Sequence, residues 1–372
     1  MLVLLACARR PLDAARTESV TAVLRGPFDW ERLLALCTRH ALLPLVDRHL
    51  QGFGDLVPAA ARERFGRAAR AALAQSVILT EELRRVLADF RTRAIPALAY
   101  KGPALAVQLH GDVTLRTFRD LDVLVTRTDF FRARQALTEL GYHPGDAISG
   151  AQEEALLRSE CDQTLIHASS GAIVELHWAV TPPHFSFPLP TEELLRRAVA
   201  VELSGLAVSA PGPEDLLLLL AMNGAKDLWT RLEPASLIAV LIERGLDWKQ
   251  VETLARDLRA RRMLALALTL ARDLLGAAPP PIASDDPALP ALVEEARARL
   301  LDDQGPGPGL LDIARFRLRS REHWADRVRY CALRAVLPTP ADAPPWPRRW
   351  WPVAFARRPW RLLRAAVRNE AR

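Results

Sequence analysis

Apolar residues recur with a helical period over the first part of the chain. Between Trp30 and Leu43 they stand three or four positions apart, which predicts an amphipathic helix with Asp29 as its N-cap. The same spacing runs through 59–93, with charged residues between the apolar ones, and predicts a second, longer helix. The chain is therefore expected to begin with a helical region.

The period shortens after Ala94. Residues 95–100 form a short apolar run, typical of a buried strand, which ends at Lys101-Gly102-Pro103. Residues 119–126 alternate polar and apolar and then become apolar, as a strand does when it enters a core from an exposed end. One or two helical turns are expected between these strands, at 104–110.

A helix and a β-hairpin are expected next. Thr128 is expected to cap a helix over 129–140 that ends at Gly141. The apolar stretches 162–168 and 172–178 flank a turn sequence, Ser169-Ser170-Gly171, and this pattern predicts two paired strands. This mixture of strands and helices predicts an α+β core built on a small mixed sheet.

The remainder is mostly helical in pattern. Pro213 opens one helix at the first-turn position that proline prefers. We expect four consecutive regions: an N-terminal helical region (1–93), the core (94–190), a helical domain packing over the core (191–277), and a Pro-rich linker with a basic helical tail (278–372). The Trp- and Arg-rich part of that tail, 346–361, is expected to pack back on its own domain, and contact with a membrane surface or a partner is the alternative.

Composition narrows the class of protein. Half of the residues are hydrophobic and a quarter are charged, so the chain can bury a sizeable core. The formal net charge of +6 comes from an excess of Arg, which fits either GC-rich coding or a triphosphate or nucleic-acid partner. No apolar run reaches the ~18 residues of a membrane span, and the four cysteines form no C-x-x-C pair. We expect a cytoplasmic protein.

The most informative chemical feature is a pair of carboxylates two residues apart. Asp120 and Asp122 would share one face of their strand, about 6.5 Å apart along the chain, while Leu121 and Val123 enter the core. Two unpaired carboxylates this close repel each other, so one is protonated or a cation lies between them. Oxygen ligands favour Mg²⁺ or Mn²⁺. Surface acids at a strand end are the simpler explanation of the motif taken alone.

Two further elements support a site. Glu175 lies inside an apolar strand pattern, where a carboxylate is costly to bury unless it is paired or binds metal, and His177 shares its face. An edge strand with one wet face explains both residues equally well. Gly102, at the start of a helix, would let a phosphate approach the backbone, and Lys101 would add a positive charge. A simple strand-to-helix turn is the alternative there.

Other residues are not expected to be catalytic. His40 falls on the apolar stripe of its helix and is expected to be a core histidine. Cys37 and Cys161 have no obvious base nearby in the sequence, so neither is expected to be a nucleophile. The P-loop, Rossmann and zincin motifs do not occur in the sequence.

Taken together, these motifs resemble a known family. A strand ending in KG, then RDLDVLV at 119–125, then ELHW at 175–178, resembles the uncharacterised nucleotidyltransferases of the polymerase-beta superfamily, which are bacterial proteins. The resemblance extends over most of 25–235, including the segment that starts at Trp30 and the one that starts at Pro213. It implies a polymerase-beta-like core.

The resemblance also implies an activity and its residues. Asp120, Asp122 and Glu175 would be the catalytic, metal-binding carboxylates of a two-metal reaction that uses Mg²⁺ or Mn²⁺. Lys101, Gly102, Arg116, Arg119 and Lys226 would bind the nucleotide, with Arg119 the weakest because it precedes Asp120 and points to the opposite face. The donor would be an NTP, with ATP favoured, and the acceptor a hydroxyl on a small molecule or peptide rather than nucleic acid.

The chain departs from the family pattern in places that bear on activity. Pro103 stands where the superfamily usually has Ser, and Asn223 and Asp227 stand where relatives have His. The alternative function is therefore a catalytically degraded accessory protein that binds nucleotide or a partner in a biosynthetic pathway. A third possibility is a nucleic-acid modifier, which would need a basic groove near Asp120. Asp122→Asn is expected to keep the fold and even to raise stability without metal, because it relieves the repulsion with Asp120.

Overall fold

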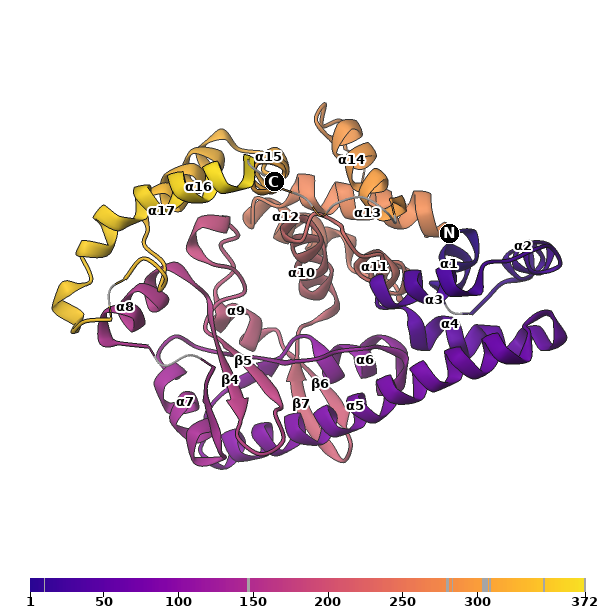
Figure 1. The fold of residues 1–372 in the computed structure, drawn as a ribbon, viewed down its shortest axis with the longest axis horizontal. Coiled ribbons are helices and arrows are strands. Elements are labelled where there is room, and N and C mark those ends of the chain that lie inside the picture. Colours follow the sequence, from indigo (N-terminus) through magenta and orange to yellow (C-terminus); the bar gives the residue numbers. More distant parts are fainter. Residues whose placement is uncertain are drawn as a thin grey trace.

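The fold combines a small mixed sheet with many helices (Figure 1). The computed structural model describes residues 1–370 apart from 10, 146–147, 279–280, 283, 303–306, 308 and 344, and side chains as far as 364. Five strands form one sheet in the order β1-β2-β5-β4-β3. Their bounds are β1 (Ala97–Ala99), β2 (Leu121–Val125), β3 (Tyr142–Pro144), β4 (Asp162–His167) and β5 (Ile173–His177).

The pairing of β2 with β5 is parallel, while the other neighbours in this sheet are antiparallel. The predicted hairpin is confirmed: β4 and β5 pair across a turn in which Gly171 has a φ of +68°. All five residues of β2 are buried. Its odd-numbered residues face one hydrophobic core and its even-numbered residues face the opposite side, which is where Asp122 lies.

One face of the sheet packs against α5 (Ala59–Thr92) and α7 (Phe130–Glu139). In Figure 1, α5 runs along the lower edge of the molecule. A two-stranded sheet of β6 (Val199–Leu203) and β7 (Leu206–Ala210) joins the same core and contacts β1. The prediction of helix there was wrong. A signal was present: Val201, Leu203, Val208 and Ala210 are buried and alternate with exposed residues, and Ser204-Gly205 forms a turn with positive φ at both positions.

Helices from two distant parts of the sequence form the second core, on the other side of the sheet. Arg9 donates hydrogen bonds of 2.7 Å to the carbonyls of Leu275 and Gly276, so the N-terminal segment caps the end of α13. The helices of this layer are α1 (Leu2–Cys7), α2 (Ala14–Leu24), α3 (Trp30–Arg39), α4 (Leu43–Leu50), α10 (Pro213–Lys226), α11 (Glu233–Arg244), α12 (Trp248–Asp257) and α13 (Arg261–Leu275).

Two helices differ from what the sequence predicted: α8 (Gly150–Ser159) was not predicted, and α7 (Phe130–Glu139) begins without the predicted cap. The sequence led to no prediction for residues 150–159, and α8 is begun by a capping box between Ser149 and Gln152. Thr128 does not cap α7; the hydroxyl of Thr126 accepts from the Asp129 N–H instead. The others are α6 (Gly102–His110), α9 (Thr191–Arg196), α14 (Leu289–Leu301), α15 (Leu310–Arg319), α16 (Trp324–Val336) and α17 (Val353–Glu370), with short 3₁₀ turns η1 (Gln51–Leu56), η2 (Val113–Leu115), η3 (Pro183–Phe185) and η4 (Arg348–Trp350). Of the Pro-rich stretch 278–290, residues 279, 280 and 283 lie outside the described residues.

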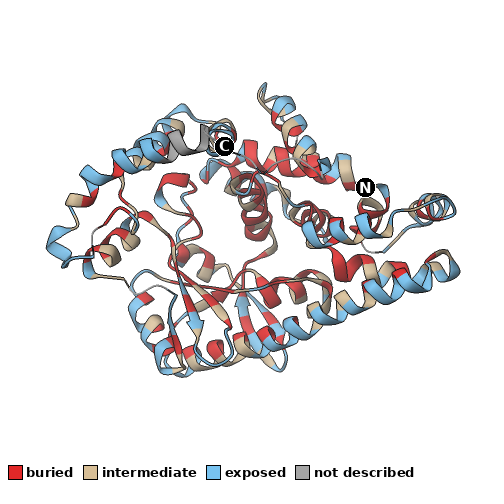
Figure 2. Cartoon of the chain, in the orientation of Figure 1, coloured by how far each residue is buried: buried red, intermediate tan, exposed pale blue. Residues whose placement is uncertain are grey.

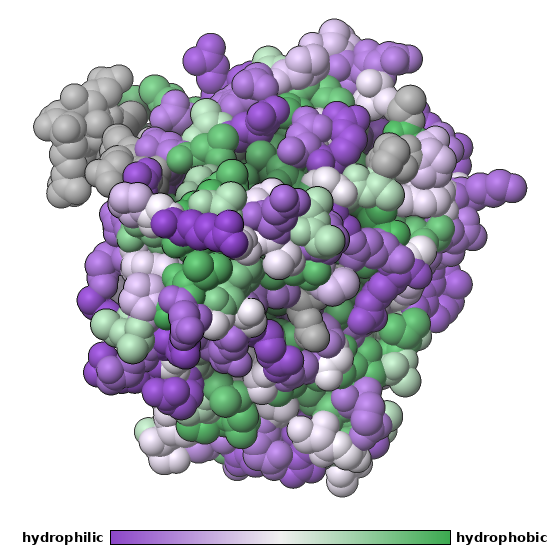
Figure 3. Space-filling model, turned by 90° about the vertical axis from the view of Figure 1, so that its right-hand side faces the viewer, coloured by the Kyte–Doolittle hydropathy of each residue, from purple (hydrophilic) through white to green (hydrophobic). Residues whose placement is uncertain are grey.

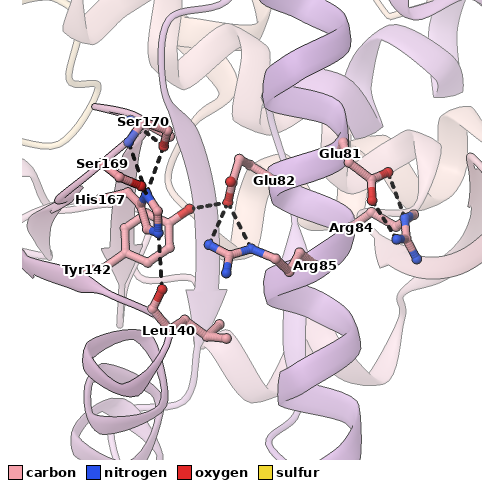
Figure 4. Close-up of polar contacts among 10 residues, drawn as sticks. Glu81, Glu82, Arg84, Arg85, Leu140, Tyr142, His167, Ser169 and Ser170 are labelled. Carbon is pink, nitrogen blue, oxygen red and sulfur yellow. Dashed lines mark hydrogen bonds and ion pairs between the residues drawn. The ribbon is translucent and has the colours of Figure 1, made fainter.

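A polar network joins α5 to the far edge of the sheet (Figure 4). The Tyr142 hydroxyl donates to Glu82 Oε2 at 2.8 Å, and Arg85 donates to the same oxygen at 3.0 Å. His167 contacts the Leu140 carbonyl through Nε2 at 3.1 Å and the Ser170 hydroxyl through Nδ1 at 2.9 Å. The short edge strand β3 is thus held by side chains as well as by its ladder.

Burial follows these layers. Figure 2 shows α10 almost wholly buried, whereas most residues of α17 as far as 364 are exposed. On the face in Figure 3, hydrophobic residues lie in separate groups between hydrophilic ones. Within the described part of the chain, no helix combines the length and apolar character needed to cross a membrane. The small mixed sheet flanked by helical regions confirms the predicted α+β fold class.

Candidate active site

The parallel pair β2–β5 brings two carboxylates side by side. Asp122 is the register partner of Glu175, so both side chains project from the same face of the sheet. His177 lies one pleat further along β5 on that face. The ligand atoms of these three residues all lie within 4.8 Å of one another. The predicted approach of Glu175 to the Asp120–Asp122 strand is thus present in the structure.

His177 bridges the two carboxylates. Its Nε2 lies 3.2 Å from Asp122 Oδ1 and 3.4 Å from Glu175 Oε2, and its Nδ1 lies 3.2 Å from the Tyr100 hydroxyl. Burial opposes the charged imidazolium, but the interactions with Tyr100, Asp122, Cys161 and Glu175 raise the pKa of His177 well above its ordinary value. A protonated ring can donate from Nε2 toward both acids.

Lys101 supplies the second positive charge. Its Nζ lies 2.7 Å from Asp122 Oδ1, which is almost fully buried. Burial would raise the pKa of Asp122, but Lys101 and His177 hold that pKa well below its ordinary value. The sequence predicted Lys101 as a nucleotide contact. In the structure its ammonium neutralises a candidate metal ligand instead.

Asp120 is compensated less fully, because the charges of Lys101 and Arg116 lower its pKa by less than other effects raise it. It directly precedes β2 rather than lying within it, and its neighbour Gly102 has a φ of +55°, the left-handed region that favours glycine. Burial raises the pKa of Asp120, and the nearby charges of Asp122 and Glu175 raise it further. Of the two aspartates, Asp120 is therefore the one that an added cation would stabilise most.

A cavity of about 820 Å³ opens beside this pair, between the sheet, α5, the N-terminal helices and the α10–α11 connection. Both aspartates line it, with Lys101, Gly102, Arg116 and Arg119. The lining residues contributed from elsewhere in the chain include Cys37, Thr38, Gln75, Leu220, Asn223, Gly224, Asp227, Trp229, Arg231, Glu233 and Leu237. Most of the predicted nucleotide-binding residues thus surround one space.

The basic side chains predicted to bind nucleotide differ in their hydrogen bonds and ion pairs. Arg116 is largely buried, pairs with Glu233 at 2.7 Å and donates to the Gly102 carbonyl at 3.2 Å. Arg119 is exposed, and no described residue offers it a hydrogen bond or an ion pair. Because both Arg119 and Asp120 precede β2, strand alternation does not separate them. Lys226 does not line the cavity, and its carbonyl accepts two hydrogen bonds from Arg317.

Several contacts were not visible in the sequence. Cys161 was expected to lack a base, but it lies beside His177; burial nevertheless raises the pKa of its thiol, and Cys161 does not line the cavity. Cys37 lines the cavity, and burial also raises its pKa. His40 is the expected core histidine: its Nδ1 accepts from the Leu232 N–H at 3.1 Å, and burial lowers its pKa to about 4. Glu233 gave no signal in the sequence.

The donor set suits a hard divalent cation. Asp122 and Glu175 offer carboxylate oxygens close together, and Asp120, with its raised pKa, lines the cavity beside them. His177, held protonated by its contacts with Asp122 and Glu175, orients these acids and is not counted among the ligands. The residues present therefore fit the metal that the sequence implied.

The two aspartates are expected to respond oppositely to neutralisation in metal-free buffer. Asp120 has a raised pKa, so its ionisation destabilises the fold as pH rises above the ordinary Asp value of ~4. Asp120→Asn should therefore raise the melting midpoint at neutral pH, and this gain should disappear below about pH 4. The measurement is a melting curve with a chelator at several pH values.

Asp122→Asn provides the matched comparison. The depressed pKa of Asp122 means that its ionised form stabilises the fold above the ordinary Asp pKa, and this contribution is lost as pH falls toward the folded-state value. Leaving Lys101 without its partner should cost about 3 kcal/mol at neutral pH, the lower end for a broken buried pair. This reverses the sequence-based expectation for Asp122→Asn. A midpoint that rises in both variants would contradict the described pairing.

Comparison with known proteins gives one decisive match. Two solved structures are similar, each at 16% sequence identity. The antibiotic-resistance factor ANT(2″)-Ia matches over 50% of this chain and 94% of its own, with a TM-score of 0.34. An antigenic nucleotidyltransferase-like protein from Paracoccidioides brasiliensis matches over 55% of this chain and 92% of its own, with a TM-score of 0.32. Similarity at this level does not bear on function. No curated protein matches the sequence significantly. The profile of a family described as uncharacterised nucleotidyltransferase matches residues 26–276, more than half of the chain, and the chain therefore belongs to that family.

Proposed function

We propose that this protein transfers a nucleoside monophosphate from an NTP, with ATP favoured, to a hydroxyl-bearing acceptor, using Mg²⁺ or Mn²⁺. The observation that carries the proposal is the register of Asp122 with Glu175, beside a cavity that Asp120 and Asp122 line. Membership of the nucleotidyltransferase family supports the same reaction class. In that reaction the acceptor oxygen bonds to the α-phosphorus, the bond to pyrophosphate breaks, and the hydroxyl loses its proton.

The three carboxylates are proposed to have different roles. Asp120 and Asp122 would hold the cation that accompanies the triphosphate, and Glu175 would complete the ligand set. A bound divalent cation supplies charge neutralisation for the phosphates. The hydrogen bond from His177 lowers the pKa of Glu175, which keeps this carboxylate ionised and able to accept from an acceptor hydroxyl or a bound water. His177 also fixes the direction of Asp122.

The triphosphate needs further positive charge, and the structure favours Arg119. Lys101 and Arg116 already pair with Asp122 and Glu233, whereas Arg119 lines the cavity with its guanidinium unengaged by any described side chain. Arg231 lines the same cavity and is exposed. Lys226 is left out of the proposed site because it does not line the cavity.

The acceptor is proposed to be a small molecule or peptide. A cavity of about 820 Å³ lies in the upper part of the range for small-molecule sites, which leaves room beside a nucleotide. Its walls include Asn223 from α10, Asp227 at the C-terminal end of that helix, and Thr38 from α3, so polar groups are available away from the metal. These residues would contact the acceptor.

An accessory role without catalysis is the second candidate. It is favoured by Arg116, which must leave a largely buried pair with Glu233 before it can reach a phosphate, and by the Asn223 and Asp227 substitutions. Nucleotide binding without turnover is its signature.

The two functions are separated by pyrophosphate release. The parent protein, incubated with Mg²⁺, each NTP and a pool of small-molecule extract, should release pyrophosphate in an acceptor-dependent manner. Asp120→Asn should lower that rate at least a hundredfold, because a ligand to the cation is lost. Tight nucleotide binding with no release from any pool would favour the accessory role. Equal rates in the parent and in Asp120→Asn would reject Asp120 as part of the site.

Arg119 and Lys226 test the nucleotide site itself. Arg119→Ala should weaken NTP binding by ~1.5–3 kcal/mol, the range for a hydrogen bond to a charged group. Lys226→Ala is the matched control, and it should bind like the parent. Titration calorimetry with a non-hydrolysable NTP and Mg²⁺ gives both values. Unchanged binding in Arg119→Ala together with weakened binding in Lys226→Ala would mean that the nucleotide lies elsewhere.

A further inference from the structure

The chain ends in a segment of unusual composition. Residues 346–364 contain six arginines and four tryptophans and no Asp, Glu or Lys. In the structure this segment comprises η4 and the first part of α17, along the upper left edge of Figure 1. It lies outside the cavity lining. The proposed nucleotidyl transfer therefore does not account for it.

One face of this segment anchors it to the rest of the protein. Ala354 and Arg358 are buried, and Arg358 pairs with the buried Asp342 at 2.9 Å. Arg358 also donates to the Arg334 carbonyl of α16 at 2.7 Å. Before the helix, Arg348 pairs with Glu154 of α8 at 2.6 Å. The tail thus packs back on its own chain, as the sequence predicted, and its orientation is fixed.

The opposite face of α17 is apolar and basic together. Trp360 and Leu363 expose 69% and 59% of their surface. Arg357 and Arg364 stand three residues before and four residues after Trp360, so helical spacing places them on the same stripe. Arg357 and Arg364 have no acidic partner among the described side chains. Trp360 therefore lies between two unpaired guanidinium groups.

The turn before the helix carries further exposed aromatic and basic side chains. Trp346 and Trp350 expose 49% and 46% of their surface and contact each other edge to face, with ring centroids 5.7 Å apart. Arg349 beside them is exposed and also lacks a described acidic partner. We call the exposed set Trp346, Arg349, Trp350, Arg357, Trp360, Leu363 and Arg364 the Trp–Arg face. Large aromatic side chains left in water indicate a surface that is covered by something else.

We propose that the Trp–Arg face docks on the surface of an anionic lipid bilayer. Tryptophan rings favour the boundary between headgroups and acyl chains, where one part of the ring meets hydrocarbon and the N–H meets water. Arginine guanidinium groups form paired hydrogen bonds with lipid phosphates. A helix with basic residues beside Trp and Leu, fixed on its other face, lies in the plane of such an interface.

Charge argues against two other occupants. A second copy of this chain docking through the same face would place arginines against arginines, since the described residues of the face include no acid. A nucleic acid would pair with the arginines and stack on the tryptophans, but it offers no hydrocarbon for Leu363. A bilayer satisfies the arginines, the tryptophans and the leucine together.

Vesicle binding tests the proposal with the full chain. The protein is sedimented with vesicles of phosphatidylcholine alone or with about one-third phosphatidylglycerol. We expect binding to the anionic vesicles only, at least tenfold stronger than to neutral ones, and weakened by added salt. Trp360→Ala and the double variant Arg357→Glu with Arg364→Glu should each reduce the partition coefficient at least tenfold, with unchanged melting midpoints because these side chains are exposed.

The controls carry exposed residues elsewhere. Phe131→Ala on α7 and Arg67→Glu on α5 remove an exposed aromatic and an exposed arginine away from the face, and both should bind vesicles like the parent. The proposal would be overturned if the parent protein did not bind anionic vesicles. It would also be overturned if Trp360→Ala bound these vesicles as well as Phe131→Ala does. A third contradictory result would be a parent protein that does not bind vesicles but binds single-stranded RNA, or dimerises in sedimentation velocity, and loses this interaction in Trp360→Ala.

Discussion

A buried carboxylate beside a partly buried one constrains the residues around them. The parallel register of β2 and β5 fixes Asp122, which is buried, opposite Glu175, which is partly exposed. Like charges this close destabilise the folded state unless cations lie nearby. Lys101 from the end of β1 and His177 from β5 provide them, and Tyr100 holds the other nitrogen of the ring.

The two aspartates are neutralised to different extents, and this difference determines where an added cation would bind. Asp122 is neutralised from within the protein, while Asp120, at the cavity wall, carries a raised pKa that only an added cation can relieve. A cation that enters from the cavity therefore meets an oxygen ligand that favours it and a second one whose orientation is already fixed by His177. Preorganised ligands of this kind lower the cost of binding.

The sequence was sufficient for the residues whose neighbours are local. Alternation of polar and apolar residues along β2 and β5 identified Asp122 and Glu175 as candidate site residues, because the pattern within each strand shows which residues share a face. It did not show that Lys101 pairs with Asp122 or that Arg116 pairs with Glu233, since those partners come from other elements. The β6–β7 hairpin was missed because its two short strands sit between helical patterns. Alternation could not rank Arg119 as a nucleotide contact, because β2 begins at Leu121 and both Arg119 and Asp120 precede it.

The central claim is that the Asp120 side of this site binds a nucleotide together with a divalent cation. The most direct measurement is titration calorimetry of a non-hydrolysable NTP into the parent protein and into Asp120→Asn, each with Mg²⁺ and with a chelator. The account predicts binding to the parent that requires Mg²⁺ and is largely lost in Asp120→Asn, which remains folded. Nucleotide binding that is equally tight without the metal, or unaffected by loss of the Asp120 carboxylate, would contradict it.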